Sequence, residues 1–414
     1  MTDPRIAGGV AIVAAAALLG LASGQGRGAI AQPKPAPSQS NCVAPTLGAP
    51  GWRNGDRPQN DPLVLHQFKL SACYPVIAPP DRRPWLAFDP RTEPQKYMRA
   101  VLDYFYEGNV RANVEDSFDP ERNPVRGWYN APWLDYTTNG REGTHGLTRE
   151  RSSCPGEIDP EQNQVWVNYA VGYYNAPGGV TIGRVWAGQG RPHPDLASMP
   201  EGTVAAKLLF TTASELQAPF LAGAPTWNAY VYDDMNDDGF FAKPGSKRHV
   251  HPVRLLQVDF AVRDSRVDAT TGWVFGTFVY GGGAGSGPST RSGWTNVEPV
   301  GLMWGNANLL DQQWINPNLR THLGWYGRLN GPIDNPRSSC LSCHATAETP
   351  DLDPLVPVPG RDPEYWFRNV PAGTPFRPGV QSLDYSLQFA VGVHNFRQVV
   401  DRWPDLGPPP RFCG

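Results

Sequence analysis

The pentapeptide Cys340-Leu341-Ser342-Cys343-His344 has the residue types and the spacing of a covalent haem site. In C-x-x-C-H, two thiols three residues apart form thioether bonds to the haem edge, and the imidazole that follows ligates the iron. We therefore predict one covalently attached haem c, with Cys340 and Cys343 as its anchors and His344 as the proximal iron ligand. A C-x-x-C pair can also form a disulfide or half of a zinc site, but the other four cysteines stand alone in the sequence.

The second axial ligand would decide the chemistry, because two strong ligands favour electron transfer and an open position favours binding and catalysis. His394 is the one histidine downstream of the motif and is our candidate distal ligand, with an ordinary helix-face or loop residue as the alternative. His249 and His251 would share one face of a strand and are the next candidates. A methionine ligand would have to fold back from upstream, because all the methionines precede the motif, the internal ones being Met98, Met199, Met235 and Met303.

A second informative stretch is residues 202–210, where Lys207 interrupts a strand that is otherwise apolar on both faces. A buried ammonium costs free energy unless it is paired. Lys207 therefore either reaches solvent at the edge of a sheet or points at a cofactor. Physical reasoning alone favours a position at the sheet edge. If Lys207 points at a cofactor instead, it is a candidate catalytic residue.

Residues 234–239 repeat the start of a calcium-binding loop. Asp234, Asn236 and Asp238 place oxygen ligands at alternate positions, and Gly239 supplies the bend. The glutamate that usually closes such a loop is replaced by Gly245. Calcium is accordingly a candidate second cofactor, and a solvated acidic turn is the alternative.

The amino terminus predicts export. Arg5 precedes an apolar run from Ile6 to Leu21, and residues 29–31 offer a small-x-small cleavage site. An uncleaved anchor is the alternative, although the run is short for a membrane span. We therefore expect a signal peptide over 1–31 and a periplasmic or secreted mature protein, the setting in which c-type haem is attached.

Four further cysteines are expected to form two disulfides. An even number of cysteines in an oxidising compartment is typical of a disulfide framework, and four cysteines allow three pairings. Free buried thiols are the alternative for any one of them. These residues are Cys42, Cys73, Cys154 and Cys413.

The pattern of apolar residues predicts a mainly β (α+β) fold with an antiparallel sheet, loop-rich additions and few helices. Apolar residues alternate from 165 to 171, and 181–186 reads as the partner strand of a hairpin. Further strands are expected at 203–211, 228–232, 253–262 and 273–280. One helix is expected to begin with Thr92 as its cap and Pro94 in its first turn and to stop at Gly108, and another is expected over 382–400.

The chain has 414 residues, with 44 prolines and 44 glycines, which predicts long ordered loops around a sizeable core. We expect a loop-rich region with one helix over 32–160 and an antiparallel-sheet c-type haem domain over 161–414. The formal net charge of −3 argues against nucleic acid and anionic membranes as partners.

Four segments, in chain order, resemble the cytochrome P-four-sixty and cytochrome c-prime-beta family. They are 202–204 with Lys207, 258–264, 271–275 and the C-x-x-C-H motif, within residues 198–346. Members are small antiparallel-sheet domains with one c-type haem, so the resemblance implies a largely β haem pocket. It also implies that Lys207 matches the lysine that cross-links to the porphyrin in the hydroxylamine-oxidising members. Other members lack this cross-link and bind nitric oxide or carbon monoxide.

Together these observations predict an exported mono-haem c-type cytochrome that performs redox chemistry at haem iron, with electron transfer as the leading hypothesis. One alternative is a P-four-sixty-like enzyme that oxidises a small nitrogen compound such as hydroxylamine. Another is a haem module that binds a diatomic gas. The expected partner is a redox protein or a small-molecule ligand, without nucleic acid and without membrane contact beyond the export signal.

Overall fold

The fold is described from a computed structural model of the chain. The described residues are 42–43, 70–71, 73–137, 140–142, 147–150, 152–159, 161–186, 191–231, 249–281, 293–306, 311–319, 339–350 and 363–400. The expected signal peptide and the expected calcium loop at Asp234, Asn236 and Asp238 lie outside these residues. Within them, no helix is both long and apolar enough to cross a membrane.

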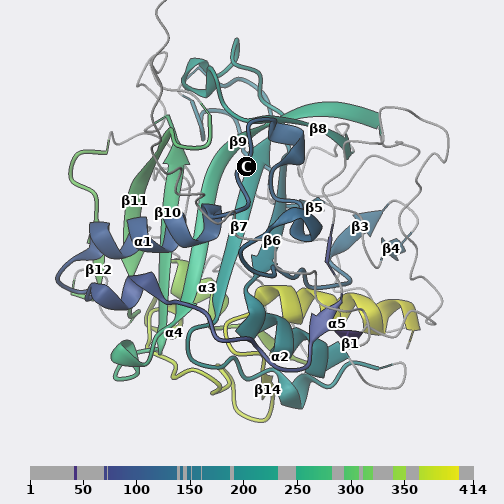
Figure 1. Ribbon diagram of the computed structural model, residues 1–414, viewed down its shortest axis with the longest axis vertical. Coiled ribbons are helices and arrows are strands. Elements are labelled where there is room, and N and C mark those ends of the chain that lie inside the picture. The colour runs from purple at the N-terminus through teal and green to yellow at the C-terminus, as the bar shows by residue number, and fades with distance from the viewer. Residues whose placement is uncertain are drawn as a thin grey trace, which may run out of the picture. The chain divides into compact units, whose positions relative to one another are not determined.

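An eight-stranded antiparallel sheet organises the protein (Figure 1), which confirms the mainly β fold predicted from the sequence. Its strand order is β12-β11-β10-β9-β7-β6-β5, and β8 pairs with β9 outside this path. The strands are β5 (Thr148–Arg149), β6 (Asn168–Tyr174), β7 (Val204–Thr211), β8 (Thr226–Val231), β9 (His249–Arg263), β10 (Trp273–Tyr280), β11 (Val297–Met303) and β12 (Gln313–Ile315).

Three two-stranded ladders and five α-helices complete the described elements. The ladders are β1 (Cys42–Val43) with β2 (Tyr74–Pro75), β3 (Asp135–Thr137) with β4 (Gly140–Glu142), and β13 (Glu348–Thr349) with β14 (Gln381–Ser382). The helices are α1 (Pro94–Tyr106), α2 (Ala176–Trp186), α3 (Cys340–His344), α4 (Pro363–Trp366) and α5 (Leu387–Val400). Short 3-10 turns occur at Pro84–Ala87, Val114–Asp116, Pro120–Arg122, Pro194–Leu196, Pro219–Leu221 and Ser265–Val267.

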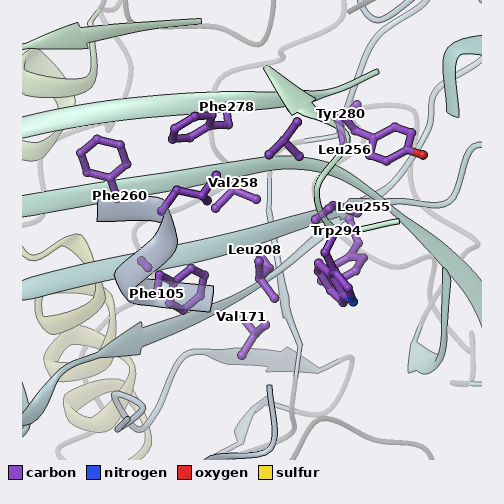
Figure 2. Packing of buried hydrophobic residues seen from close by; sticks show 14 of the residues in the cluster. Phe105, Val171, Leu208, Leu255, Leu256, Val258, Phe260, Phe278, Tyr280 and Trp294 are labelled. Atoms are coloured by element: carbon purple, nitrogen blue, oxygen red, sulfur yellow. The ribbon is translucent and has the colours of Figure 1, made fainter. Parts of the chain in front are cut away.

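One face of the sheet carries a hydrophobic core that α1 covers. Successive side chains of a strand point to opposite faces, so alternate residues of neighbouring strands share this core. Leu208 of β7, Val258 and Phe260 of β9, and Phe278 of β10 pack together here, and Phe105 of α1 belongs to the same cluster (Figure 2). In Figure 1, α1 crosses in front of the sheet.

The opposite face carries a second core, to which α2, α3 and α5 contribute. Its members include Ala261 of β9 and Phe275 of β10, which alternate with residues of the first core. Leu341 of α3 and Phe389 of α5 pack into the same cluster. The sheet therefore separates two cores, and the C-x-x-C-H helix belongs to the second.

The helix expected after residue 92 is confirmed as α1. Tyr97, Val101 and Phe105 recur at helical spacing and are buried against the sheet. The predicted cap is wrong, because Glu93 rather than Thr92 occupies the N-cap position and makes no side-chain capping bond. Gly108 follows the helix with a φ of +74°, a conformation that glycine adopts without strain.

The expected hairpin between 165–171 and 181–186 is wrong. The first segment overlaps β6, which starts at Asn168, but residues 181–186 belong to α2, and β7 takes the place beside β6. Ile182, Val185 and Trp186 are buried, as are most residues of α2. A helix buried on nearly all sides has no polar face, so its apolar run is hard to distinguish from a strand by pattern alone.

The other strand predictions are confirmed within a few residues, as β7, β8, β9 and β10. β11 and β12 were missed because Pro299 and Gly301 interrupt the apolar pattern of β11, and a register shift accompanies them opposite β10. The expected helix over 382–400 starts later, since α5 begins at Leu387.

Candidate haem centre

The C-x-x-C-H motif forms the short helix α3, and a reciprocal capping box holds its first turn. The Ser339 hydroxyl accepts a hydrogen bond from the backbone N–H of Ser342 at 3.0 Å, and the Ser342 hydroxyl accepts one from the Ser339 N–H at 2.6 Å. The Ser339 hydroxyl also donates to Oδ1 of Asn306 at 2.6 Å. Ser339 and Ser342 are buried, so these bonds replace water at the start of the helix.

Neither cysteine of the motif is in a disulfide. Cys340 and Cys343 are half-buried thiols, whereas Cys73 and Cys154 are each disulfide-bonded. Burial raises the pKa of the Cys340 thiol well above its ordinary value, and the charge of Asp259 adds to this effect. Cys340 is therefore a neutral thiol. Which of the three possible pairings of Cys42, Cys73, Cys154 and Cys413 is formed stays a prediction, and Cys413 lies outside the described residues.

His344 is oriented by a backbone carbonyl. Its Nδ1 lies 2.8 Å from the carbonyl oxygen of Tyr385, and its ring centroid lies 4.6 Å from that of Phe275. A carbonyl only accepts, so Nδ1 carries the hydrogen and Nε2 has the lone pair of the neutral ring. Burial, with a smaller contribution from the charge of Lys207, lowers the pKa of His344 to about 4.

These features fit a covalent haem. Two thiols that are not in disulfides lie one helical turn apart, and the adjacent imidazole is neutral, with the nitrogen that ligates metals unprotonated. A hydrogen bond from the second ring nitrogen to a carbonyl is the usual support of a metal-bound histidine. Cys340 and Cys343 would hold the haem edge, and Nε2 of His344 would ligate the iron.

Lys207 lies inside the sheet, so the sheet-edge interpretation is wrong. β7 pairs with β6 on one side and β9 on the other, and Lys207 stands directly opposite both Gly172 and Asp259. The same row continues through Thr277 of β10 to Gly301 of β11. Directly opposed residues of a sheet share a face. This polar row therefore lies on the face of the second core, the face to which α3 packs.

Asp259 is the partner of Lys207. Its Oδ2 lies 3.2 Å from the Lys207 ammonium, and its Oδ1 accepts hydrogen bonds from Gln257 at 2.7 Å and from Thr277 at 2.8 Å. Burial works against the charged form of Lys207, but the carboxylates of Glu150 and Asp259 outweigh it and raise the pKa of the ammonium. Lys207 is therefore a fixed cation.

The fold brings Lys207 and the motif into one electrostatic group. The charge of Lys207 lowers the pKa values of both Cys340 and His344, and the charge of Asp259 raises both. Sequence reasoning missed Asp259 and Tyr385. Asp259 had a signal, because it is a lone acid within the apolar stretch 258–262, just as Lys207 is a lone base.

The candidate distal ligands occupy different places. His394 is buried on α5, with 6% of its surface exposed. His249 and His251 lie on one face at the start of β9, with ring centroids 5.9 Å apart, which confirms their shared face. Eight residues of β9, about 26 Å of strand, separate His251 from Asp259, which places the two histidines away from the motif.

Two methionines belong to the second core. Met303 stands opposite Phe275 in the β10–β11 pair, and Met199 packs in the same cluster. Met98 lies in the first core, and Met235 is outside the described residues.

Among the residues that the structure describes, no three His, Cys, Asp or Glu side chains are grouped as ligands of one ion.

Comparison of the chain with protein-family models, with curated proteins and with solved structures finds no match.

Proposed function

We propose that this chain is an exported mono-haem c-type redox protein whose leading role is electron transfer. The observation that carries the proposal is the bond between His344 and Tyr385. It leaves Nε2 of a neutral imidazole as the nitrogen available to a metal, next to two cysteines of the same helix that form no disulfide. Bound haem would supply one-electron chemistry at iron.

The residues around the motif support such a role. Phe275 packs against His344, and Leu341 and Ala345 of α3 join the same apolar core, so the proximal side is shielded from water. An apolar surrounding of this kind favours the less charged redox state of a haem and holds its ligand rigidly. We expect the partner to be a redox protein, or a small-molecule ligand if the distal position is open, in the periplasm or outside the cell.

The P-four-sixty-like alternative is favoured by one observation, the position of Lys207. This lysine lies on the sheet face to which α3 packs, and its charge lowers the pKa of Cys340. Its ion pair with Asp259 counts against a cross-link, because an ammonium has no free lone pair to form a bond to the porphyrin. Gas binding without a cross-link is the third candidate.

Absorption spectra of the reduced protein, with and without carbon monoxide, separate these roles. Electron transfer with two strong ligands predicts a sharp spectrum that the gas leaves unchanged, whereas an open iron site predicts a shift. The intact mass decides the cross-link, because we expect one haem held by two thioether bonds alone.

Serine substitution tests the haem itself. Cys340→Ser with Cys343→Ser is expected to abolish haem that survives denaturing electrophoresis. The matched control is Ser342→Thr, which keeps a hydroxyl between the two thiols. Covalent haem in the double variant would contradict the assignment, as would a colourless wild-type protein made with an intact maturation system.

A further inference from the structure

The carbonyl that orients His344 belongs to a short segment, residues 382–386, which we term the His344 strap. Asp384 and Tyr385 in this strap have φ values of +49° and +64°. Neither residue is glycine, and such a conformation is unfavourable for other residues unless the surroundings fix it. Two consecutive residues in this region indicate a backbone shape that the rest of the fold imposes.

Hydrogen bonds to the Asp384 carboxylate hold this backbone conformation in place. Its Oδ2 accepts a hydrogen bond from the backbone N–H of Met199 at 2.6 Å. Its Oδ1 accepts from the indole N–H of Trp273 and from the backbone N–H of Gly373, each at 3.0 Å. Only 1% of Asp384 is exposed, so these three donors, from three separate segments, replace water around a buried carboxylate.

Tyr385 connects the strap to the motif through its backbone carbonyl. Its carbonyl accepts the bond from Nδ1 of His344, and its hydroxyl donates to the carbonyl of Val370 at 2.5 Å. Its ring lies 6.3 Å from the rings of both Trp273 and Phe275. Trp273 thus contacts the strap twice, through its N–H on Asp384 and through its ring beside Tyr385.

We propose that Asp384 is a positioning residue for the haem ligand: it fixes the left-handed strap, and the strap's Tyr385 carbonyl fixes the tautomer and orientation of His344. This inference rests on the proposed haem function. A carboxylate suits the position because it accepts all three donors. An asparagine has one accepting oxygen, and its NH₂ group would face a backbone N–H.

The hydrogen bond to the Tyr385 carbonyl would set the basicity of His344 as an iron ligand. A neutral imidazole that donates to an amide carbonyl binds iron more strongly than one whose N–H lacks an acceptor, and loss of such outer partners commonly costs 10–100-fold in metal affinity. The ferric and ferrous states respond unequally to ligand basicity. A tenfold change in the ratio of their affinities for His344 equals about 59 mV for one electron.

The test uses the full-length, haem-loaded protein and measures the midpoint potential and the ferric electron paramagnetic resonance spectrum. Asp384→Asn is expected to change the affinity ratio about tenfold or more, a shift of about 59 mV, and to broaden the resonance lines as the imidazole becomes less ordered. Asp264→Asn is the matched control. Asp264 is equally buried but bonds to Tyr97 and Arg266 and lies outside the strap.

Trp273→Phe gives a second, milder variant, because it removes one donor to Asp384 and keeps an aromatic ring. It is expected to shift the potential in the same direction by a smaller amount, and it decides the question if Asp384→Asn does not accumulate as folded protein. Potentials and resonance spectra that match those of Asp264→Asn, with one haem bound, would overturn the role of Asp384 and leave the haem assignment intact. A wild-type protein without covalent haem would overturn both.

Discussion

The ammonium of Lys207 lies 3.2 Å from Oδ2 of Asp259, directly across the β7–β9 pair and on the sheet face that holds the C-x-x-C-H helix. The side chains of Lys207 and Asp259 are 32% and 22% exposed, so water screens the pair only in part. The pair sets the charge around the motif, because each member shifts the pKa values of Cys340 and His344.

A double-mutant cycle with Lys207→Met and Asp259→Asn should give a coupling free energy of about 1–2 kcal/mol, within the usual range for contacting charged groups. Each single variant leaves one charge without its partner, so the double variant should unfold at a higher urea concentration than the sum of the two losses predicts. Equilibrium urea unfolding measures all four proteins. Arg91 and Asp89, an exposed pair, serve as the control cycle, with an expected coupling below about 1 kcal/mol. Strict additivity at 207 and 259 would contradict the prediction.

The haem-free chain should lose stability in mild acid because of His344. The folded state holds the imidazole neutral with a pKa of about 4, against 6.5 ordinarily, so the unfolded chain binds the proton more readily between these values. The contribution of His344 is therefore complete above about pH 6.5 and is lost as the pH falls through 4. We expect a loss of about 3 kcal/mol, measured by urea unfolding at a series of pH values.

His344→Gln is the control for the acid effect, because glutamine keeps an N–H donor but does not titrate. It should flatten the pH dependence in that interval. If the variant and the wild type lose stability in parallel, another group is responsible.

Two glycines of the sheet should respond differently to alanine. A methyl group at Gly276 would meet the buried ring of Phe260 in the first core, whereas one at Gly172 would meet the terminal amide of Gln388 from α5. The amide can turn aside and the ring cannot. We expect Gly276→Ala to cost about 1–3 kcal/mol, and Gly172→Ala to change stability by about 0.5 kcal/mol or less, because the lower backbone entropy of the unfolded chain offsets the displacement. Thermal or urea unfolding gives both values, and equal losses would refute the distinction.

Ser339→Ala should destabilise the start of α3. The substitution removes the acceptor for the Ser342 N–H and the donor to Asn306, both in a buried setting. The expected loss is about 1–2 kcal/mol. Ser214→Ala is a control on an exposed hydroxyl that bonds locally to Gln217, with an expected loss of a few tenths of a kcal/mol. Hydrogen exchange of the Ser342 and Cys343 amides should rise in the Ser339 variant, and unchanged protection would argue against the capping box.

The part of the candidate site that lies in one pentapeptide could be read from the sequence, because C-x-x-C-H fixes the order of its chemical groups locally, and its haem stays a prediction. The sequence did not reveal the residues that the fold places beside His344 and Lys207. Tyr385 acts through its backbone carbonyl, which every residue has, so its side chain offers no signal. Asp259 was visible as an isolated acid, but its pairing with Lys207 depends on the β7–β9 register.

The fold was predictable where a short apolar run follows a glycine, as in β7 and β10, and where a helix has one apolar stripe, as in α1. Prediction failed at α2, because a helix surrounded by protein has no polar face to reveal its period. It also failed at β11, whose Pro299 and Gly301 resemble loop residues. In these segments burial and register, rather than local pattern, determine the structure.

The His344 strap has a consequence for the order in which the protein is made. All strands of the large sheet lie before residue 316, and the strap and α5 come after the C-x-x-C-H motif. A chain emerging from its amino end can therefore complete the sheet and present both thiols while the imidazole still lacks its carbonyl acceptor. If a haem is attached at the motif, its attachment could precede closure of the strap, which would then supply the carbonyl acceptor for His344.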